Sequence, residues 1–216
     1  MPAQAQQLQA KAPTEIPATF PFKKYDMWSL DMDQRLVDYN ARHAWMDVGM
    51  FAFVCWEWVK PLVEWLGNRR VLEVMAGAGW LAKALREKGI DVIATDNGSW
   101  PKERGWTPQS EVEELDALLA IEKYADQTDI LVMSWPYMDD RAFEVIKLWD
   151  KLKPGAMVIY IGESDGGCTA DEQFFRHFED VEDPTFEQVS GRYIAWWGIH
   201  DRVCLGRYQH ATNTES

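Results

Sequence analysis

The chain has 216 residues and carries 22 Lys and Arg against 35 Asp and Glu, which gives a formal net charge of -13 at pH 7. That length fits one domain with a full hydrophobic core, and the acidic charge argues against a protein that grips nucleic acid phosphates. The cysteines Cys55, Cys168 and Cys204 lack metal-binding spacing and suit a reducing compartment. No stretch is apolar over the roughly 20 residues that a membrane span needs. We therefore expect a cytoplasmic protein without a metal site or a membrane segment.

The N-terminal third predicts a tail followed by helices. Residues 1–20 are rich in Ala, Gln, Pro and Thr, which is typical of a flexible tail. Residues 21–67 form a helical extension, because apolar residues recur every three or four positions from Trp45 to Val63, with Pro61 as the expected kink or break. This stripe suits a buried core. Trp28 and Tyr39 lie outside it, and are the better candidates for a lid over a bound ligand.

Residues 70–96 read as strand, glycine loop, helix and strand. An apolar strand at 71–74 leads into Gly77-Ala78-Gly79, a helix over 80–88 follows, and a second strand ends at Asp96. Glycines at such a turn let the backbone approach a ligand closely, and an acid at the end of the second strand suits the two hydroxyls of a ribose. The pattern predicts a nucleotide site.

Two cofactor classes fit this loop. Gly77-x-Gly79-x-x-Ala82 matches the fingerprint that holds the pyrophosphate of a dinucleotide. Read from Glu73 through both glycines, the stretch resembles the first motif of class I S-adenosylmethionine-dependent methyltransferases, acid-x-Gly-x-Gly-x-Gly, with Met75 at the first glycine. Glu73 favours the second class, because a carboxylate beneath a pyrophosphate would repel it, whereas a ligand with an ammonium and a sulfonium tolerates it.

The segment after Asp96 predicts further ligand contacts. Asn97 opens a polar loop over 97–106 that is long for an α/β connection, and such loops are often functional. A short third strand at 111–115 then leads to Asp116-Ala117. The methyltransferase resemblance implies that these two residues border the adenine. Asp116 fits equally well as the N-terminal cap of a helix over 118–124.

A second informative stretch ends a buried strand at Ser134-Trp135-Pro136-Tyr137. Ligands bind at the carboxyl ends of parallel strands, so this loop should face the glycine loop. It resembles the fourth motif of amino-directed methyltransferases, [Asp/Asn/Ser]-Pro-Pro-aromatic, with Trp135 at the first proline. The resemblance implies that Ser134 accepts from the target amine, while Tyr137 packs beside the methyl donor. The alternative is an ordinary strand-to-helix loop with aromatic packing.

The last third predicts the end of the sheet. A fifth strand at 156–163 places Glu163 at its carboxyl end, where this residue could line a substrate pocket. Residues 186–189 with 193–197, and then 202–208, suit a terminal antiparallel hairpin. Such a hairpin is what the methyltransferase resemblance implies for an otherwise parallel sheet. Residues 209–216 are expected to be a tail.

Together these patterns predict a doubly wound α/β domain over residues 68–208, with a mostly parallel, Rossmann-like sheet of about seven strands and an N-terminal helical extension. The predicted function is S-adenosylmethionine-dependent methyl transfer to a nitrogen of a small molecule or protein side chain. The alternatives are a nicotinamide-dependent oxidoreductase and a non-catalytic, methyltransferase-like binding protein. The predicted cofactor residues are Glu73, Gly77, Gly79, Asp96, Asn97, Asp116, Ala117 and Ser134. The predicted catalytic and acceptor residues are Ser134, Trp135, Pro136, Tyr137 and Glu163.

Overall fold

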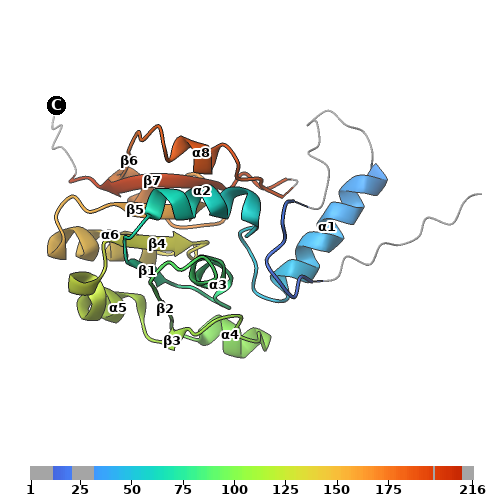
Figure 1. Cartoon of the computed structure of the whole chain (residues 1–216), viewed down its shortest axis with the longest axis horizontal. Helices are drawn as coiled ribbons and strands as arrows, with labels where there is room; N and C mark the ends of the chain where they lie inside the picture. Colours follow the sequence, from blue (N-terminus) through green and yellow to red (C-terminus); the bar gives the residue numbers. More distant parts are fainter. Residues whose placement is uncertain (1–11, 21–31, 197, 211–216) are drawn as a thin grey trace, which may run out of the picture.

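The computed structural model describes residues 12–20, 32–196 and 198–210, and the side chains of residues 32–37 are outside this description. The predicted lid residue Trp28 and the predicted tail segments 1–11 and 211–216 lie outside the described residues. Within them, a single sheet is flanked by helices on both faces (Figure 1). None of the helices described is long and apolar enough to cross a membrane.

The seven strands are ordered β3-β2-β1-β4-β5-β7-β6. Their bounds are β1 Val71–Val74, β2 Val92–Asp96, β3 Glu113–Glu114, β4 Ile130–Ser134, β5 Val158–Gly162, β6 Phe178–Asp180 and β7 Arg202–Tyr208. The five strands from β3 to β5 pair in parallel, whereas β7 runs antiparallel to both β5 and β6. The prediction of a mostly parallel, seven-stranded α/β sheet is confirmed. Because the chain leaves β1 for β2 on one side and reaches β4 on the other, the strand order reverses between β1 and β4, where a ligand crevice is expected.

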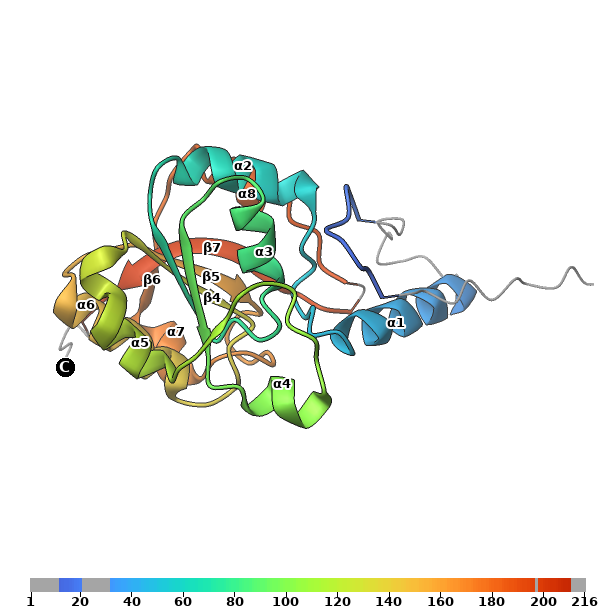
Figure 2. The ribbon, with the colours of Figure 1, turned by 60° about the horizontal axis from the view of Figure 1, so that its bottom comes forward.

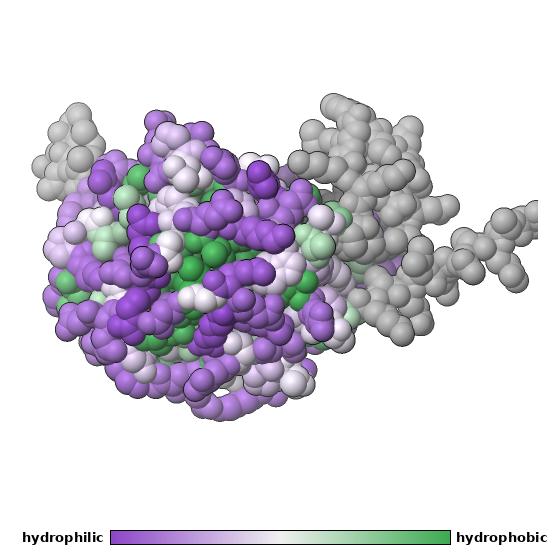
Figure 3. Space-filling view, in the orientation of Figure 1, coloured by the Kyte–Doolittle hydropathy of each residue, from purple (hydrophilic) through white to green (hydrophobic). Residues whose placement is uncertain are grey.

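Two helical layers cover the sheet. The helices are α1 Met32–Met46, α2 Trp56–Leu66, α3 Trp80–Arg86, α4 Ser99–Arg104, α5 Ala117–Tyr124, η1 Ala125–Gln127, α6 Arg141–Leu152, α7 Glu172–His177 and α8 Glu187–Ser190. Helices α2, α3 and α8 pack on one face of the sheet, and α5, α6 and α7 on the other (Figure 2). Figure 3 shows that polar residues cover most of the outer face seen there, with apolar residues showing through near its middle.

The short strand β1 illustrates why the sheet is buried on both faces. Its four residues are all buried. Val71 packs in the core beside α2 and α3, whereas Leu72 and Val74 pack in the core beside α5 and α6. Successive side chains of a strand point to opposite faces. Glu73 therefore points to the same side as Val71, toward α3 and the glycine loop.

Part of the segment expected to be a flexible tail is packed against the domain. Ile16 is 7% exposed, and the Trp56 amide donates to the carbonyl of Pro17 at 2.9 Å. The ring of Phe20 lies edge-on to Phe53, with 4.8 Å between centroids. The tail prediction is therefore wrong for residues 12–20. Single apolar residues scattered among Pro and Ala carry no periodicity, and their partners lie more than 30 residues away along the chain.

The aromatic helix predicted from Trp45 to Val63 is two helices. Helix α1 ends at Met46, residues 50–54 contain no helix, and α2 begins at Trp56. The break falls at Gly49, whose φ of 80° leaves the helical region, and Pro61 lies inside α2. The chain therefore turns before the expected proline.

Three further boundaries differ from the predictions. The polar loop over 97–106 contains α4, which is bracketed by Gly98 and Gly105 in left-handed conformations. Residues 187–190 form α8 in place of a hairpin strand, and the strand that pairs with β7 is β6, directly after α7. Gln209, expected in a tail, donates its amide to the carbonyl of His177 at 2.8 Å. Short elements of this kind are decided by their tertiary partners more than by local propensity.

Candidate functional site

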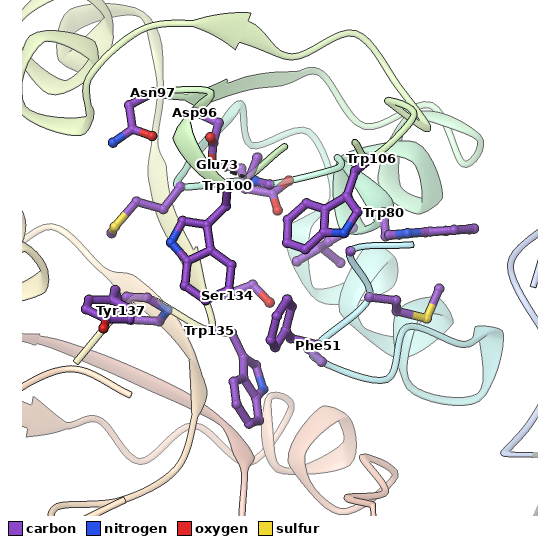
Figure 4. Close-up of a pocket in the computed structure, with 18 of the residues that line it drawn as sticks. Phe51, Glu73, Trp80, Asp96, Asn97, Trp100, Trp106, Ser134, Trp135 and Tyr137 are labelled. Carbon is purple, nitrogen blue, oxygen red and sulfur yellow. Dashed lines mark hydrogen bonds between the residues drawn. The ribbon is translucent and has the colours of Figure 1, made fainter. Parts of the chain in front are cut away.

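A cavity of about 480 Å³ lies at the carboxyl ends of β1, β2 and β4, at the point where the strand order reverses (Figure 4). Helix α1, residues 49–54, α4 and the loop after β4 complete its walls. All but two of the predicted site residues line it, namely Glu73, Gly77, Asp96, Asn97, Asp116, Ala117, Ser134, Trp135, Pro136 and Tyr137. The structure thus brings together residues that lie up to 64 positions apart in the sequence (Glu73 to Tyr137).

The two exceptions, Gly79 and Glu163, lie behind the cavity wall. A Cβ on Gly79 would lie 2.8 Å from Cγ2 of Val112, so this glycine permits close packing of the loop. Glu163 is 7% exposed, and its carboxylate accepts from the backbone amides of His200 at 3.1 Å and Cys168 at 2.8 Å. Glu163 therefore holds the loop whose Cys168 lines the cavity, and Glu163 itself is not among the lining residues.

Three amides of the glycine loop are already used within the protein. Gly77 donates to Oδ2 of Asp96 at 2.8 Å, Ala76 to the carbonyl of Thr95 at 3.0 Å, and Gly79 to the carbonyl of Ala76 at 2.9 Å. The other oxygen of Asp96 accepts from the Gly98 amide at 2.7 Å. Asp96 therefore ties the loops after β1 and β2 together, while each of its oxygens keeps a lone pair for one more donor.

Glu73 presents a buried carboxyl group to the cavity. Its side chain lines the cavity although the residue is only 1% exposed, and its Oε2 has no hydrogen-bond partner among the described residues. Burial raises the pKa of Glu73 from 4.5 to about 8, against the opposing effects of Arg86 and the Ala82 amide. The group is therefore mostly protonated at neutral pH. A buried acceptor without a donor is costly, and this one lies where a ligand could supply the donor.

Two bulky residues beside the cavity adopt left-handed backbone conformations. Met75 follows β1 with a φ of 56°, and Trp135 follows β4 with a φ of 53°. Such conformations cost energy for residues other than glycine and cluster at functional sites. Met75 occupies the first glycine position of the methyltransferase motif, and its φ is one that glycine adopts freely. Proline is fixed near a φ of about -65°, so the Trp135 loop cannot have the backbone of the double-proline motif.

Five aromatic residues from three separate segments line the cavity, and we call them the aromatic wall: Phe51, Trp100, Trp106, Trp135 and Tyr137. Ring centroids lie 5.7 Å apart for Phe51 and Trp106, 5.8 Å for Phe51 and Trp135, and 5.9 Å for Trp100 and Tyr137. Figure 4 shows Phe51 and Trp135 at the end of the cavity away from Asn97 and Asp96. Phe51, Trp100 and Trp106 were not among the site residues predicted from the sequence. The available signal was the pair of tryptophans within the polar stretch 97–106.

A buried acid fixes the ring of Trp135 from behind. Oδ2 of Asp201 accepts from Nε1 of Trp135 at 2.9 Å and from the hydroxyl of Tyr193 at 2.5 Å. Asp201 is 6% exposed, and burial raises its pKa. Since Asp201 lies 66 residues after Trp135, no local pattern connects them.

Asp116 serves the helix cap and the cavity at once. Its Oδ1 accepts from the Leu118 amide at 2.9 Å, which caps α5, and Oδ2 lies 3.6 Å from Nη1 of Arg141. The predicted cap is confirmed. Because Asp116 and Ala117 also line the cavity, both of the alternatives left open by the sequence remain compatible with the structure.

No protein-family model and no curated protein matches the chain. Among solved structures it is similar to a protein that converts a disulfide bond into a thioacetal group in echinomycin biosynthesis, at 15% identity and a TM-score of 0.46, over 73% of this chain and 82% of that one. It is also similar to magnesium protoporphyrin IX methyltransferase from Synechocystis PCC 6803 with bound SAM, at 12% identity and a TM-score of 0.44, over 86% and 88% of the chains. A SAM-dependent methyltransferase from Archaeoglobus fulgidus matches at 16% identity and a TM-score of 0.41, over 68% and 93%.

Proposed function

We propose that the chain is an S-adenosylmethionine-dependent methyltransferase that acts on a small-molecule acceptor. The observation that carries this proposal is the pair of acids in one cavity. Glu73 offers a buried oxygen without a partner beneath the glycine loop, and Asp96 stands at the end of the adjacent strand. A ligand that has a cationic amino group and a ribose satisfies both acids.

The same loop geometry argues against the nicotinamide alternative. A pyrophosphate needs free backbone amides at a helix N-terminus. Here the amides of Ala76, Gly77 and Gly79 all donate within the protein. Two acids beside the loop would also repel a pyrophosphate once ionised.

We call the part of the cavity lined by Glu73, Gly77, Asp96 and Asn97 its polar end, and the proposal gives roles to the acids and small residues there. Glu73 would accept from the ammonium of the methionine moiety, and Asp96 from the ribose hydroxyls. Asn97, Asp116 and Ala117 would border the adenine. The bound cofactor supplies a methyl group on a sulfonium, which a nucleophile can displace directly. The chain then has to bind and orient both molecules, and orientation alone can supply a large part of the rate.

The acceptor would lie between the aromatic wall and Ser134. Trp135 and Phe51 exclude water and restrict the acceptor's orientation, while the Ser134 hydroxyl can accept a hydrogen bond from the attacking group. Nitrogen as the target atom stays a prediction. It depends on the likeness of Ser134, Pro136 and Tyr137 to the amino-directed motif, and the left-handed backbone of Trp135 separates this loop from that motif.

Calorimetric titration of the purified chain with S-adenosylmethionine, S-adenosylhomocysteine, NADH and NADPH tests the proposal. We expect the two sulfur compounds to bind and the two nicotinamides not to bind. Asp96→Ala should lower the affinity for S-adenosylmethionine and for S-adenosylhomocysteine by about a hundredfold, because it removes two charge-assisted hydrogen bonds to the ribose. Thermal unfolding of this variant shows whether the loops that Asp96 connects remain folded.

Asp91→Ala is the matched control for Asp96→Ala. Asp91 precedes the same strand at its opposite end, is exposed, and pairs with Arg70 at 2.7 Å. The control should bind both sulfur compounds as the wild type does. Binding of a nicotinamide alone would overturn the proposal, and binding of S-adenosylmethionine without methyl transfer to any of a broad set of acceptors would support the non-catalytic alternative.

A further inference from the structure

We infer that Arg42 recognises a carboxylate on the methyl acceptor, so that the substrate is a small apolar or aromatic carboxylic acid. This inference rests on the proposed function and extends it to the class of substrate. It starts from a positive charge in the cavity wall for which the described part of the chain provides no ion-pair partner.

Arg42 reaches the cavity from α1. Its guanidinium lies over the ring of Trp135, with 5.8 Å between Cζ and the ring centroid. Its Nε is buried without a hydrogen-bond partner, and no carboxylate among the described residues lies within 4.0 Å of its guanidinium nitrogens. A partly buried guanidinium without an anion is costly, and its planar donors match a carboxylate.

Asp201 and Cys168, which feel the charge of Arg42, have other partners. Arg42 is close enough to lower the pKa values of Asp201 and Cys168, although neither is paired with it. Oδ2 of Asp201 accepts from Trp135 and Tyr193, and burial raises the pKa of Asp201, which reduces the negative charge it offers. Neither group therefore neutralises Arg42, whose guanidinium has no salt-bridge partner among the described residues.

The surroundings favour a carboxylate with an apolar body over a phosphate. A phosphate dianion would need more positive charge than Arg42 provides. The other cavity arginine, Arg141, lies 3.6 Å from Asp116, and its amide donates to the side chain of Asp139. Asp96, Asp116 and Asp139 line the same cavity and would repel a dianion. Beside Arg42, the exposed faces belong to the aromatic wall, which suits an aromatic or aliphatic body.

The carboxylate of the cofactor's own methionine is the competing partner for Arg42. The ring beneath Arg42 belongs to Trp135, which lies at the end of the cavity away from Asp96 and Asn97 (Figure 4). This placement assigns Arg42 to the acceptor. The first experiment separates the two cases with 5′-methylthioadenosine, which keeps the nucleoside and lacks the amino-acid carboxylate.

The first experiment measures the affinities of S-adenosylhomocysteine and 5′-methylthioadenosine for the wild type, Arg42→Gln and His43→Gln. His43 is the matched control, because it is exposed on the same helix and does not line the cavity. We expect all three proteins to bind both nucleosides equally. Loss of S-adenosylhomocysteine affinity in Arg42→Gln, with the affinity for methylthioadenosine kept, would overturn the inference. Failure of the wild type to bind either nucleoside would instead overturn the proposed function.

The second experiment titrates the S-adenosylhomocysteine-saturated protein with benzoate, benzamide and benzylamine, and ligand-detected NMR reports binding. We expect the wild type to prefer benzoate over benzamide by at least about tenfold, the size expected for a charge-assisted pair. Arg42→Gln should remove this preference, and Arg42→Lys should keep part of it, since lysine keeps the charge without the planar donors. Equal binding of benzoate and benzamide in the wild type, preference for benzylamine, or no detectable benzoate binding would overturn the inference.

Discussion

The two ends of the cavity are built in different ways. The polar end takes Glu73, Gly77, Asp96 and Asn97 from one continuous strand-loop-helix-strand unit, and each of these residues lies within three positions of the end of a strand. The aromatic wall is assembled from three separate segments that lie between residues 51 and 137. Its members lie in loops or short helices and contact one another through their rings.

This difference separates a general function from a specific one. The polar end depends on backbone geometry that any doubly wound sheet provides at its switch point. The aromatic wall depends on how residues 49–54, residues 99–106 and the loop after β4 pack over that point. Changes at the polar end should therefore alter binding of the cofactor, whereas changes in the aromatic wall should alter the choice of acceptor.

The largest effect is expected at Gly49, where the two ends meet. A Cβ there would lie 2.7 Å from Cβ of Ala78 in the glycine loop and 3.0 Å from the ring of Trp106. Gly49 has a φ of 80°, so Gly49→Ala should lower the free energy of unfolding by about 1–2 kcal/mol through the left-handed conformation. Overpacking should lower it by about 1–3 kcal/mol more. Urea unfolding measures the loss.

Gly155→Ala is the matched control, because Gly155 has a φ of 72° and no heavy atom within 4 Å of the added Cβ. Its free energy of unfolding should fall only by the cost of holding alanine in the left-handed conformation. Equal losses in the two variants would mean that the loop at Gly49 moves away without cost, and that the two ends of the cavity are not coupled there.

Glu73 should make the stability of the polar end depend on pH. Since burial raises its pKa from 4.5 to about 8, the folded state holds this proton more tightly than the unfolded chain does. The contribution to stability is complete below the unfolded pKa and is lost as the pH rises toward 8, by at most about 1.4 kcal/mol per pH unit. Glu73→Gln has no carboxyl group to ionise at this position. Its free energy of unfolding, relative to that of the wild type, should therefore rise as the pH increases from 4.5 to about 8.

Binding of the cofactor should reverse this behaviour at Glu73. An ammonium beside the carboxyl group favours the ionised form, so binding should release a proton, and wild-type affinity for S-adenosylmethionine should increase as the pH approaches 8. Calorimetry in buffers with different ionisation enthalpies measures the proton release. Equal release by Glu73→Gln and the wild type would show that another group is titrating.

The smallest effects are expected behind the aromatic wall. Trp135→Phe and Tyr193→Phe each remove one of the two donors to Oδ2 of Asp201, and each should lower the free energy of unfolding by about 1 kcal/mol. The double variant leaves that buried oxygen without either donor. Its free energy of unfolding should therefore fall by more than the sum of the decreases in the two single variants. Urea unfolding of the four proteins measures this coupling. Additive losses would contradict a shared network, and a weakened affinity for S-adenosylmethionine would place Trp135 at the cofactor instead.

Much of the polar end could be predicted from the sequence, because its residues are close together in the chain. The apolar run before Gly77 and the acid that closes the next strand indicate strands, loop and ligand in a single local pattern. The mostly parallel, seven-stranded sheet followed from the alternation of strands and helices and from the family resemblance. Gly79 does not line the cavity, and its ligand role stays a prediction, because a glycine that permits packing and one that permits ligand approach look alike in a sequence.

The sequence by itself determined the sheet, the glycine loop and the acids at the strand ends, since periodicity and turn chemistry act within a few residues. Only the tertiary structure decided that Phe51 faces Trp135, that Asp201 holds the Trp135 ring, and that Arg42 lies over it. These contacts join residues 66 to 93 positions apart. Whether such residues meet depends on where loops and helices pack over the sheet, and no local pattern encodes that.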